Sequence, residues 1–155
     1  MPRKIILDCD PGHDDAIAIM LALASEELEI LGITTVYGNV GLERTTRNAL
    51  VVREVLGKSV PIYAGTDRPL VRDRISAEAV HGVSGLEGPH LPTPSGQAEP
   101  KHAVHFIIEQ VLQHPGEVTL VPVGPLTNIA LAMRLEPRII TQIREIVLMG
   151  GSIDI

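Results

Sequence analysis

The stretch Ile6–Ile19 reads ILDCDPGHDDAIAI, and in it an apolar run gives way to a Pro-Gly turn and then to an Ala-rich segment. The run before the turn, KIILDCD, is aliphatic and β-branched, which predicts a buried strand. The segment after the turn, DDAIAIMLALAS, predicts a helix with acidic residues in its first turn. The stretch therefore joins a strand to a helix and carries four closely spaced carboxylates, those of Asp8, Asp10, Asp14 and Asp15.

The same alternation of strand and helix continues along the chain. Further strands are predicted over residues 28–39, 60–65, 117–124 and 143–151, and further helices over residues 42–57, 101–114 and 126–137. Continuous apolar strands that alternate with helices are typical of a parallel sheet covered on both faces. We therefore expect one α/β domain over residues 1–155, with a mostly parallel sheet flanked by helices.

Residues 66–100 interrupt this pattern with a stretch rich in Gly, Pro and Ser. Loops of this length within a compact domain are usually functional or disordered. We expect this segment to lie over the mouth of an active site, with a short helix near residues 75–80.

Composition narrows the choice of partners and location. The 155 residues carry a formal net charge of -6 without a long block of like charge, which argues against nucleic acid and anionic membranes as partners. Cys9 is the only cysteine, so an internal disulfide is impossible and a reducing cytoplasm is expected. The apolar run Ala16–Ala24 is too short to span a bilayer, which takes about 20 residues. The start, MPRKIIL, lacks the apolar region of a signal peptide.

The four closely spaced carboxylates are expected to bind a cation. Asp8 and Asp10 lie two positions apart, so on a strand they share one face at its carboxyl end, where open α/β sheets bind ligands. Two carboxylates about 7 Å apart repel by roughly 2 to 2.5 kcal/mol at an effective dielectric constant of 20. A hard cation such as Ca²⁺ or Mg²⁺ relieves this repulsion. Asp14 or Asp15 taken alone is equally well an ordinary acid at a helix start.

Several motifs together resemble one family. DCDPGHDDAIAI, ITTVYGN, VHGVSG, LVPVGPLTNIALA and REIVLMGG occur in the order and spacing of the inosine-uridine preferring nucleoside hydrolases, and the likeness covers essentially the whole chain. The resemblance implies a Rossmann-like α/β fold, one bound Ca²⁺ and hydrolysis of the N-glycosidic bond of ribonucleosides to ribose and free base. It also implies a role in nucleoside catabolism and purine or pyrimidine salvage, with a ribonucleoside as substrate. A homo-oligomer is expected for another reason, because strands such as REIVLMGG and VTLVPVG are apolar throughout and need cover on both faces.

The resemblance assigns three metal ligands. Asp10 is implied both to bind Ca²⁺ and to act as general base on a Ca²⁺-bound water. Asp15 is implied as a second carboxylate ligand, and Thr127 as a ligand through its backbone carbonyl. On its sequence alone, Thr127 could equally begin a helix.

The resemblance also assigns the substrate contacts. Asp14 is implied to hydrogen-bond a ribose hydroxyl, Asn39 to sit beside the nucleophilic water and the sugar, and His81 to lie near the nucleobase. Without the motifs, Asn39 would be an ordinary turn residue and His81 a solvated side chain. His13, within the first motif, is expected to be a turn residue rather than a catalyst.

The chain differs from the family in its extent, and two alternatives stay open, one of them because an Asp-x-Asp at a strand end also resembles another enzyme class. Family members continue for about as much chain again and supply a final Asp ligand, whereas here Asp154 does not match that pattern. The sequence thus resembles the N-terminal portion of a nucleoside hydrolase, with the activity of this chain alone an open question. The alternatives are a haloacid-dehalogenase-like Mg²⁺ phosphatase with Asp8 as nucleophile, and a non-catalytic truncated remnant that binds a cation or a partner chain.

Overall fold

A computed structural model describes residues 1–151 of the chain, so Asp154 lies outside the described part. Its centre is a five-stranded, all-parallel sheet in the order β3-β2-β1-β4-β5. The strands are β1 (Arg3–Cys9), β2 (Leu28–Thr35), β3 (Ile62–Ala64), β4 (Thr119–Pro122) and β5 (Glu145–Ile146). The helices are α1 (His13–Ala24), α2 (Leu42–Val55), α3 (Glu78–His81), α4 (Ala103–Gln113), α5 (Thr127–Leu135) and the 3-10 helix η1 (Pro137–Thr141). The predicted α/β class with a parallel sheet is confirmed.

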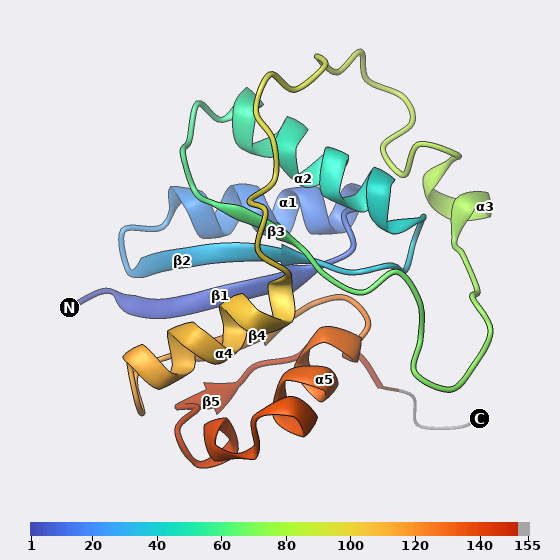
Figure 1. The fold of residues 1–155 in the computed structure, drawn as a ribbon. Helices are drawn as coiled ribbons and strands as arrows, with labels where there is room; N and C mark the ends of the chain where they lie inside the picture. The colour runs from blue at the N-terminus through green and yellow to red at the C-terminus, as the bar shows by residue number, and fades with distance from the viewer. Residues whose placement is uncertain (152–155) are drawn as a thin grey trace.

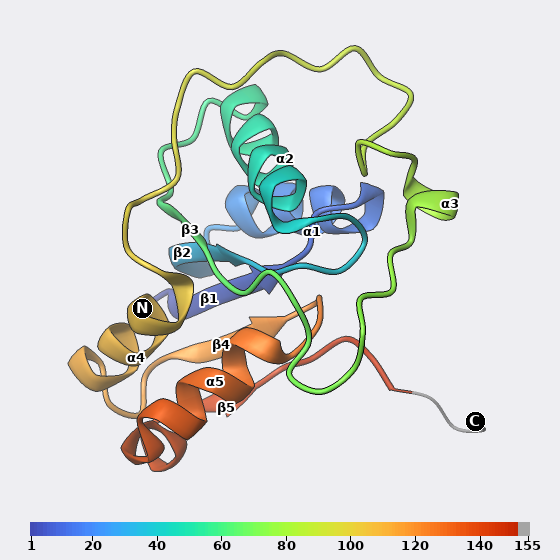
Figure 2. The same cartoon turned by 45° about the vertical axis from the view of Figure 1, so that its right-hand side comes forward.

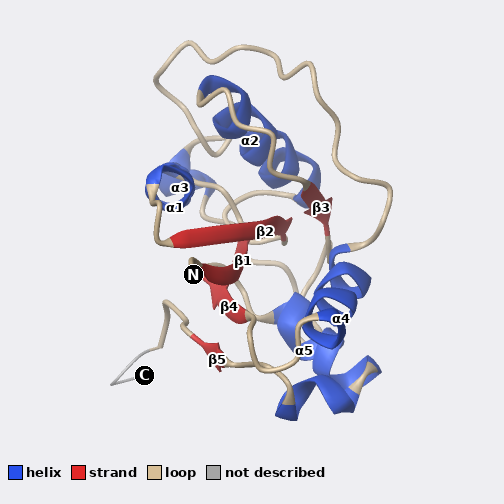
Figure 3. Cartoon of the chain, turned by 90° about the vertical axis from the view of Figure 1, so that its left-hand side faces the viewer, coloured by secondary structure: helices blue, strands red, loops and turns tan. Residues whose placement is uncertain are grey.

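Helices cover both faces of the sheet. α1 and α2 lie on one face and α4 and α5 on the other (Figures 1 and 3). Successive residues of β1 supply the two cores, because side chains alternate across a strand. Leu7 and Cys9 pack into the α1/α2 layer, whereas Ile6 packs into the α4/α5 layer. Both faces of β1 are therefore apolar, as its sequence predicts.

The strand order creates a switch point beside β1. The chain moves outward from β1 through β2 to β3 and then returns to place β4 on the other side of β1. In register, Cys9 pairs with Thr35 of β2 and Asp8 pairs with Pro122 of β4. The segments that follow β1, β2 and β4 therefore converge at one edge, where ligands bind in folds of this kind.

The last predicted strand is much shorter than expected. Residues 143–151 were predicted as strand, but β5 is only Glu145–Ile146. The backbone N–H groups of Val147 and Met149 still donate to Leu120 O (2.9 Å) and Pro122 O (3.1 Å) of the neighbouring segment. Within the described part of the chain, no strand pairs with the outer edge of β5, so regular strand geometry has support on one side only.

The helix predicted over residues 126–137 also ends early. α5 stops at Leu135, and the chain continues into η1, whose first residue is Pro137. The Glu136 side chain caps η1 by accepting a hydrogen bond from Arg138 N (3.2 Å). A proline cannot continue the α-helical hydrogen bonds, and it suits the first position of a new turn.

The segment between β3 and α4 is long, and α3 is its only helix in the structure. Figure 2 shows it passing from β3 towards α5, then to α3, and finally over α2 on its way to α4. α3 overlaps the short helix predicted near residues 75–80. Of the helices in the described part of the chain, none has the length and hydropathy that crossing a bilayer requires.

Candidate functional site

Asp10 follows β1 directly and is held in a slot between two glycines. Its Oδ2 accepts a hydrogen bond from Asn39 N (2.7 Å), and the side chain is buried. A Cβ atom on Gly38 would lie 1.9 Å from Asp10 Oδ2, and one on Gly124 would lie 2.3 Å from Oδ1. Only residues without a side chain fit at these positions, so the loops after β2 and β4 together fix the carboxylate.

Asp15 lies beside it in the first turn of α1. Its Oδ2 accepts hydrogen bonds from Gly12 N (3.2 Å) and from Asn39 Nδ2 (3.3 Å), so it caps the helix and contacts the loop after β2. Asn39 Nδ2 also donates to Asp10 O (3.0 Å). Asn39 therefore contacts both acidic residues and connects them.

Burial and neighbouring carboxylates raise the pKa values of this pair. The pKa of Asp10 rises to about 7, mainly through burial and then through the charge of Asp15. The pKa of Asp15 rises to about 6, again mainly through burial, with Asp14 raising it further and His81 opposing the rise. Both carboxylates would be stabilised in their charged form by a nearby cation.

The residues present suit a hard cation, because their donor atoms are oxygens. Asp15 Oδ1 is buried and has no hydrogen-bond partner, although buried carboxylate oxygens are normally satisfied. Thr127, the first residue of α5, lines a cavity of about 290 Å³ together with Gly38, the neighbour of Asp10. Among residues 1–151, no three His, Cys, Asp or Glu side chains form a metal-ligating group. The described residues can therefore offer a cation two carboxylates and backbone carbonyl oxygens, and solvent would supply its other ligands.

Asp8 is hydrogen-bonded to residues outside the acidic pair. It is completely buried, and its Oδ1 accepts hydrogen bonds from Thr34 Oγ1 (2.5 Å) and Asn128 Nδ2 (2.8 Å). Burial raises its pKa to about 7 in spite of these two bonds. The reason is that β1 ends at Cys9, so Asp8 points into the packed sheet while Asp10 lies beyond it. A nucleophile must reach its substrate, so this geometry gives the phosphatase alternative no support.

Asp14 and His81 meet at the rim of the acidic pair. The Asp14 side chain is 65% exposed, and its Oδ1 lies 4.0 Å from His81 Nε2. His81, the last residue of α3, packs against the start of α1, where its Nδ1 lies 3.4 Å from His13 N. The long segment therefore brings His81 to the other predicted site residues. His13 begins α1 and is not a turn residue as expected.

Asn128 is a structural residue of the site that the sequence analysis did not identify. It is completely buried, and its Nδ2 donates to Asp8 Oδ1 and to Thr35 O (3.0 Å). Its Oδ1 accepts from Thr66 N (2.9 Å) at the start of the long segment. Asn is common at helix starts, so its place in the sequence indicates a helix cap. Its hydrogen-bond partners instead lie in three other segments, which the sequence does not bring together.

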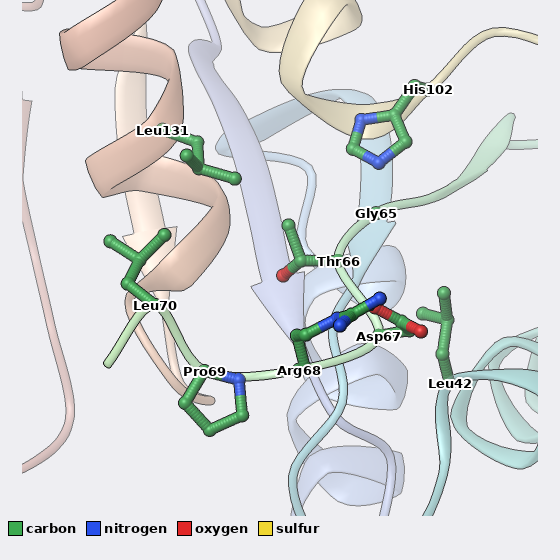
Figure 4. Close-up of a pocket in the computed structure, with 9 residues that line it drawn as sticks. All are labelled: Leu42, Gly65, Thr66, Asp67, Arg68, Pro69, Leu70, His102 and Leu131. Carbon is green, nitrogen blue, oxygen red and sulfur yellow. The ribbon is translucent and has the colours of Figure 1, made fainter. Parts of the chain in front are cut away.

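Two cavities are lined in part by residues of the long segment. The cavity in Figure 4, of about 620 Å³, is lined by residues that follow β3 together with His102 of the α4 start and Leu131 of α5. None of Asp10, Asp14 and Asp15 lines it. The 290 Å³ cavity borders Gly38 and Thr127, and residues of the long segment, from Pro69 to Ile75, form its other wall. None of the three acidic residues lines this second cavity either, but it borders Gly38, the residue that follows Tyr37 and lies against Asp10 Oδ2.

The fold and site define a doubly wound α/β protein with an acidic site at the carboxyl ends of its central strands. The model of the inosine-uridine preferring nucleoside hydrolase family matches residues 5–155, and the chain belongs to this family. The resemblance expected from the motifs is thereby confirmed.

Several relatives support the same placement. The pyrimidine-specific ribonucleoside hydrolase RihB of Escherichia coli K12 is 54% identical over 150 residues, which are 97% of this chain and 48% of the relative. A solved purine-preferring ribonucleoside hydrolase from Gardnerella vaginalis is 41% identical with a TM-score of 0.92, over 97% of this chain and 49% of that one. A plant nucleoside hydrolase is 37% identical with a TM-score of 0.90, over 98% and 49%. The chain spans about half the length of the relatives it matches.

Proposed function

We propose that this chain carries part of the active site of a ribonucleoside hydrolase, which cleaves the N-glycosidic bond with water to give ribose and the free base. The observation that carries the proposal is the convergence of Asp10 and Asp15 on Asn39 at the switch point of the sheet. Membership of the nucleoside hydrolase family supports the same reaction.

Asp10 is suited to act as the general base. Without a metal ion, burial raises the pKa of Asp10 to about 7, and a bound cation would lower it and keep the carboxylate in the free form that accepts a proton. The hydrogen bond from Asn39 N and the two flanking glycines hold its carboxylate in one orientation. Asn39, which contacts Asp10 and Asp15, is placed to position the attacking water.

The metal component of the proposal rests on the same residues. Asp10, Asp15 and the backbone carbonyl of Thr127 would hold Ca²⁺, which when bound lowers the pKa of a coordinated water and draws in ribose hydroxyls. The orphaned Asp15 Oδ1 supports this assignment. With this set alone, we expect weak binding.

The residues of the rim are suited to bind substrate. The Asp14 carboxylate is open to solvent and can accept a hydrogen bond from a ribose hydroxyl, while His81 lies beside it, where a nucleobase would project. Glycoside cleavage passes through an oxocarbenium-like transition state, which nearby carboxylates stabilise. The relatives include a pyrimidine-specific and a purine-preferring enzyme, so the proposal covers both classes of base.

The proposal extends to the setting of the protein. We place it in the cytoplasm, in nucleoside catabolism and salvage, as a homo-oligomer. The single thiol, Cys9, is buried in the core, which suits a reducing compartment. Apolar side chains at residues 146–149 are exposed, which supports association between chains.

Ribose release from inosine and uridine tests the reaction. We expect little or no release by this chain alone, and release once it is joined to the part of a relative that the match leaves uncovered. In that fusion, Asp10→Asn should lower the rate by at least about 10²-fold, because it removes the base and a ligand together. Asp8→Asn should cost less, because Asp8 lies outside the acidic pair. An Asp10→Asn fusion that keeps its rate would refute the assignment, and phosphate-ester hydrolysis that requires Asp8 would favour a phosphatase.

Thermal unfolding with and without Ca²⁺ tests the metal component on this chain itself. At a hundredfold excess of Ca²⁺ over its dissociation constant, the stabilisation should be about 2.7 kcal/mol. Asp10→Asn should remove it, whereas Asp67→Asn, at an exposed carboxylate in an ion pair with Arg74, should retain it. A melting temperature that responds neither to Ca²⁺ nor to chelator would count against the site.

A further inference from the structure

A buried amide on α2 links the two turns that carry residues of the proposed site. Asn48 is 1% exposed, and its Nδ2 donates to Pro11 O (3.0 Å) and to Ser84 O (2.8 Å). Pro11 directly follows Asp10, the proposed base. Ser84 belongs to the turn that comes after His81. Both hydrogens of one amide group therefore hold backbone from two segments that are far apart in the sequence.

The second of these turns is shaped to meet Asn48. Gly85, next to Ser84, has a φ of +83°, and a Cβ atom there would lie 2.8 Å from Asn48 Nδ2. Both the left-handed backbone and the close approach require glycine at this position. Leu86 follows and is buried in the α1/α2 core. The turn after His81 is therefore packed against the body of the protein.

α3 has little packing of its own to fix its place. It is four residues long, and none of them is buried. Before α3, Ala77 N donates to Asn39 O (2.9 Å), and after it the bond from Asn48 reaches Ser84. The position of His81, the last residue of α3, therefore depends on the bonds that flank the helix.

His81 itself lies against the turn that carries the acidic residues. Its side chain is 15% exposed, and a Cβ atom on Gly12 would lie 2.7 Å from its Nδ1. Its Nε2 lies 4.0 Å from Asp14 Oδ1, at the rim of the acidic pair. A small shift of the turn after His81 would therefore move the imidazole relative to the proposed ribose contact.

We propose that Asn48 is a positioning residue of the substrate site. By fastening the turn after His81 to the turn after Asp10, it places the His81 imidazole where the nucleobase binds. Asn48 acts through the backbone of the two turns and not through contact with the reacting atoms. The role in nucleobase binding rests on the proposed function, whereas the fastening of the two turns does not.

Hydrogen exchange of the full chain tests the fastening. Asn48→Leu nearly keeps the size of the side chain but leaves Pro11 O and Ser84 O without this donor. The amides of residues 82–87 should then exchange at least about fivefold faster than in wild type, because the loss of one such bond raises an open population by about that factor. Val111→Ala is the stability control, because Val111 is fully buried in the α4/α5 layer, away from both turns. It should leave the exchange of residues 82–87 unchanged.

A second variant relies on an exposed residue, so that the test does not depend on a buried substitution. Arg44, also on α2, donates from Nη1 to Val83 O (2.5 Å) in the same turn, and its side chain is 47% exposed. Arg44→Met should shift exchange in the same direction as Asn48→Leu. Arg53→Met is the matched control, because Arg53 on the same helix donates to Val60 O (3.3 Å), outside this turn. It should behave as wild type.

Kinetics of the fusion with the uncovered part of a relative test the role in substrate binding. In Asn48→Leu, KM for inosine and uridine should rise about fivefold or more, while kcat changes by less than about twofold. This split is expected because Asp10 is held by Asn39 N and by the flanking glycines, not by Asn48. Adding Asn48→Leu to His81→Ala should raise KM no further, because Asn48 acts through His81.

Three outcomes would overturn the proposal. They are unchanged exchange of residues 82–87 in both Asn48→Leu and Arg44→Met, an unchanged KM of Asn48→Leu in an active fusion, and a further rise of KM in the double variant. A wild-type fusion that releases no ribose would count against the proposed function instead, and the exchange rates would still decide whether Asn48 fastens the two turns.

Discussion

Asp10 depends on two residues that have no side chain. Gly38 and Gly124 contact opposite oxygens of its carboxylate, and Asn39 N donates to one of them. The orientation of the proposed base is therefore set by backbone from the loops after β2 and β4. These loops belong to the site as much as the acidic residues do.

We predict that Gly38→Ala displaces the Asp10 carboxylate. The new methyl group would lie 1.9 Å from Oδ2, so the side chain or the backbone must move, at a cost of roughly 1–3 kcal/mol. Urea unfolding should show this loss, together with a weaker Ca²⁺ response. Gly41→Ala is the control, because a Cβ there meets nothing within 4 Å, and its stability should change by less than about 1 kcal/mol. Equal losses of stability in the two variants would contradict the conclusion that Gly38 must lack a side chain to leave room for Asp10.

We predict that Asp8→Asn removes a pH dependence of stability. The pKa of Asp8 is raised from 3.8 to about 7, so between these values the folded chain holds a proton that the unfolded chain releases. The stability from this group is present below about pH 4 and is lost as the pH rises towards about 7, by up to about 4 kcal/mol. The asparagine keeps an oxygen acceptor for Thr34 and Asn128.

Urea unfolding in chelator at several pH values measures this effect. The variant should gain stability relative to wild type as the pH rises from about 4 to about 8. Parallel stability curves for the two proteins would show that Asp8 does not titrate in this way.

At the scale of the elements, Tyr37 holds the first part of the long segment in place. Its hydroxyl donates to Ile75 O (2.5 Å), and the guanidinium of Arg74 lies 5.3 Å from the ring centroid. Ala77 N donates to Asn39 O (2.9 Å) nearby. The wall of the cavity that borders Gly38 is thus fastened to the loop after β2.

We predict that Tyr37→Phe loosens this wall. Loss of the hydroxyl bond costs about 1 kcal/mol, which corresponds to roughly a fivefold rise in the open population. Trypsin should cut after Arg72 and Arg74 correspondingly faster, as measured by mass spectrometry of the fragments. Tyr63→Phe is the control, because the Tyr63 ring stacks on Phe106 at a centroid distance of 3.8 Å and lies away from this loop. Equal cleavage rates in both variants would contradict the role of Tyr37.

The sequence predicted most elements and the closeness of Asp10 and Asp15, because the signals are local. β1, α1 and the acidic turn between them follow from apolar pattern and turn chemistry, which places Asp10 and Asp15 together. The family motifs brought in Asn39 and His81. The inward turn of Asp8 and the contacts of Asn128 were not predicted, since burial at a strand end depends on what packs there.

The length of β5 also could not be predicted from the local sequence. Residues 143–151 have the apolar pattern of a buried strand, but strand geometry also requires a neighbour to pair with. The sequence did not predict η1, because a proline such as Pro137 is equally typical of the end of one helix and of the first residue of the next.

At the scale of the whole molecule, apolar side chains remain exposed along the β5 edge. Ile146, Val147, Leu148 and Met149 are between 38% and 55% exposed. Apolar patches of this kind, next to an unpaired strand edge, mark surfaces for association.

We predict concentration-dependent self-association of the chain through this edge, measured by sedimentation velocity. Leu148→Lys should shift the distribution towards monomer, because a charge is costly to bury in an apolar contact. Val55→Lys, at a similarly exposed apolar position on α2, should leave the distribution unchanged. A monomer at all concentrations, or equal effects of both lysines, would contradict this prediction.

The bond between Asn128 and Asp8 has a consequence for synthesis of the chain. Its two residues are 120 positions apart, so at about 5–20 residues per second the ribosome adds Asn128 roughly 6 to 24 s after Asp8. During that interval β1, α1 and β2 have been made, but the Asp8 carboxylate lacks its amide partner. Burial without this partner costs free energy, so the carboxylate stays solvated. The first βαβ unit therefore reaches its final packing only after α5 has been translated.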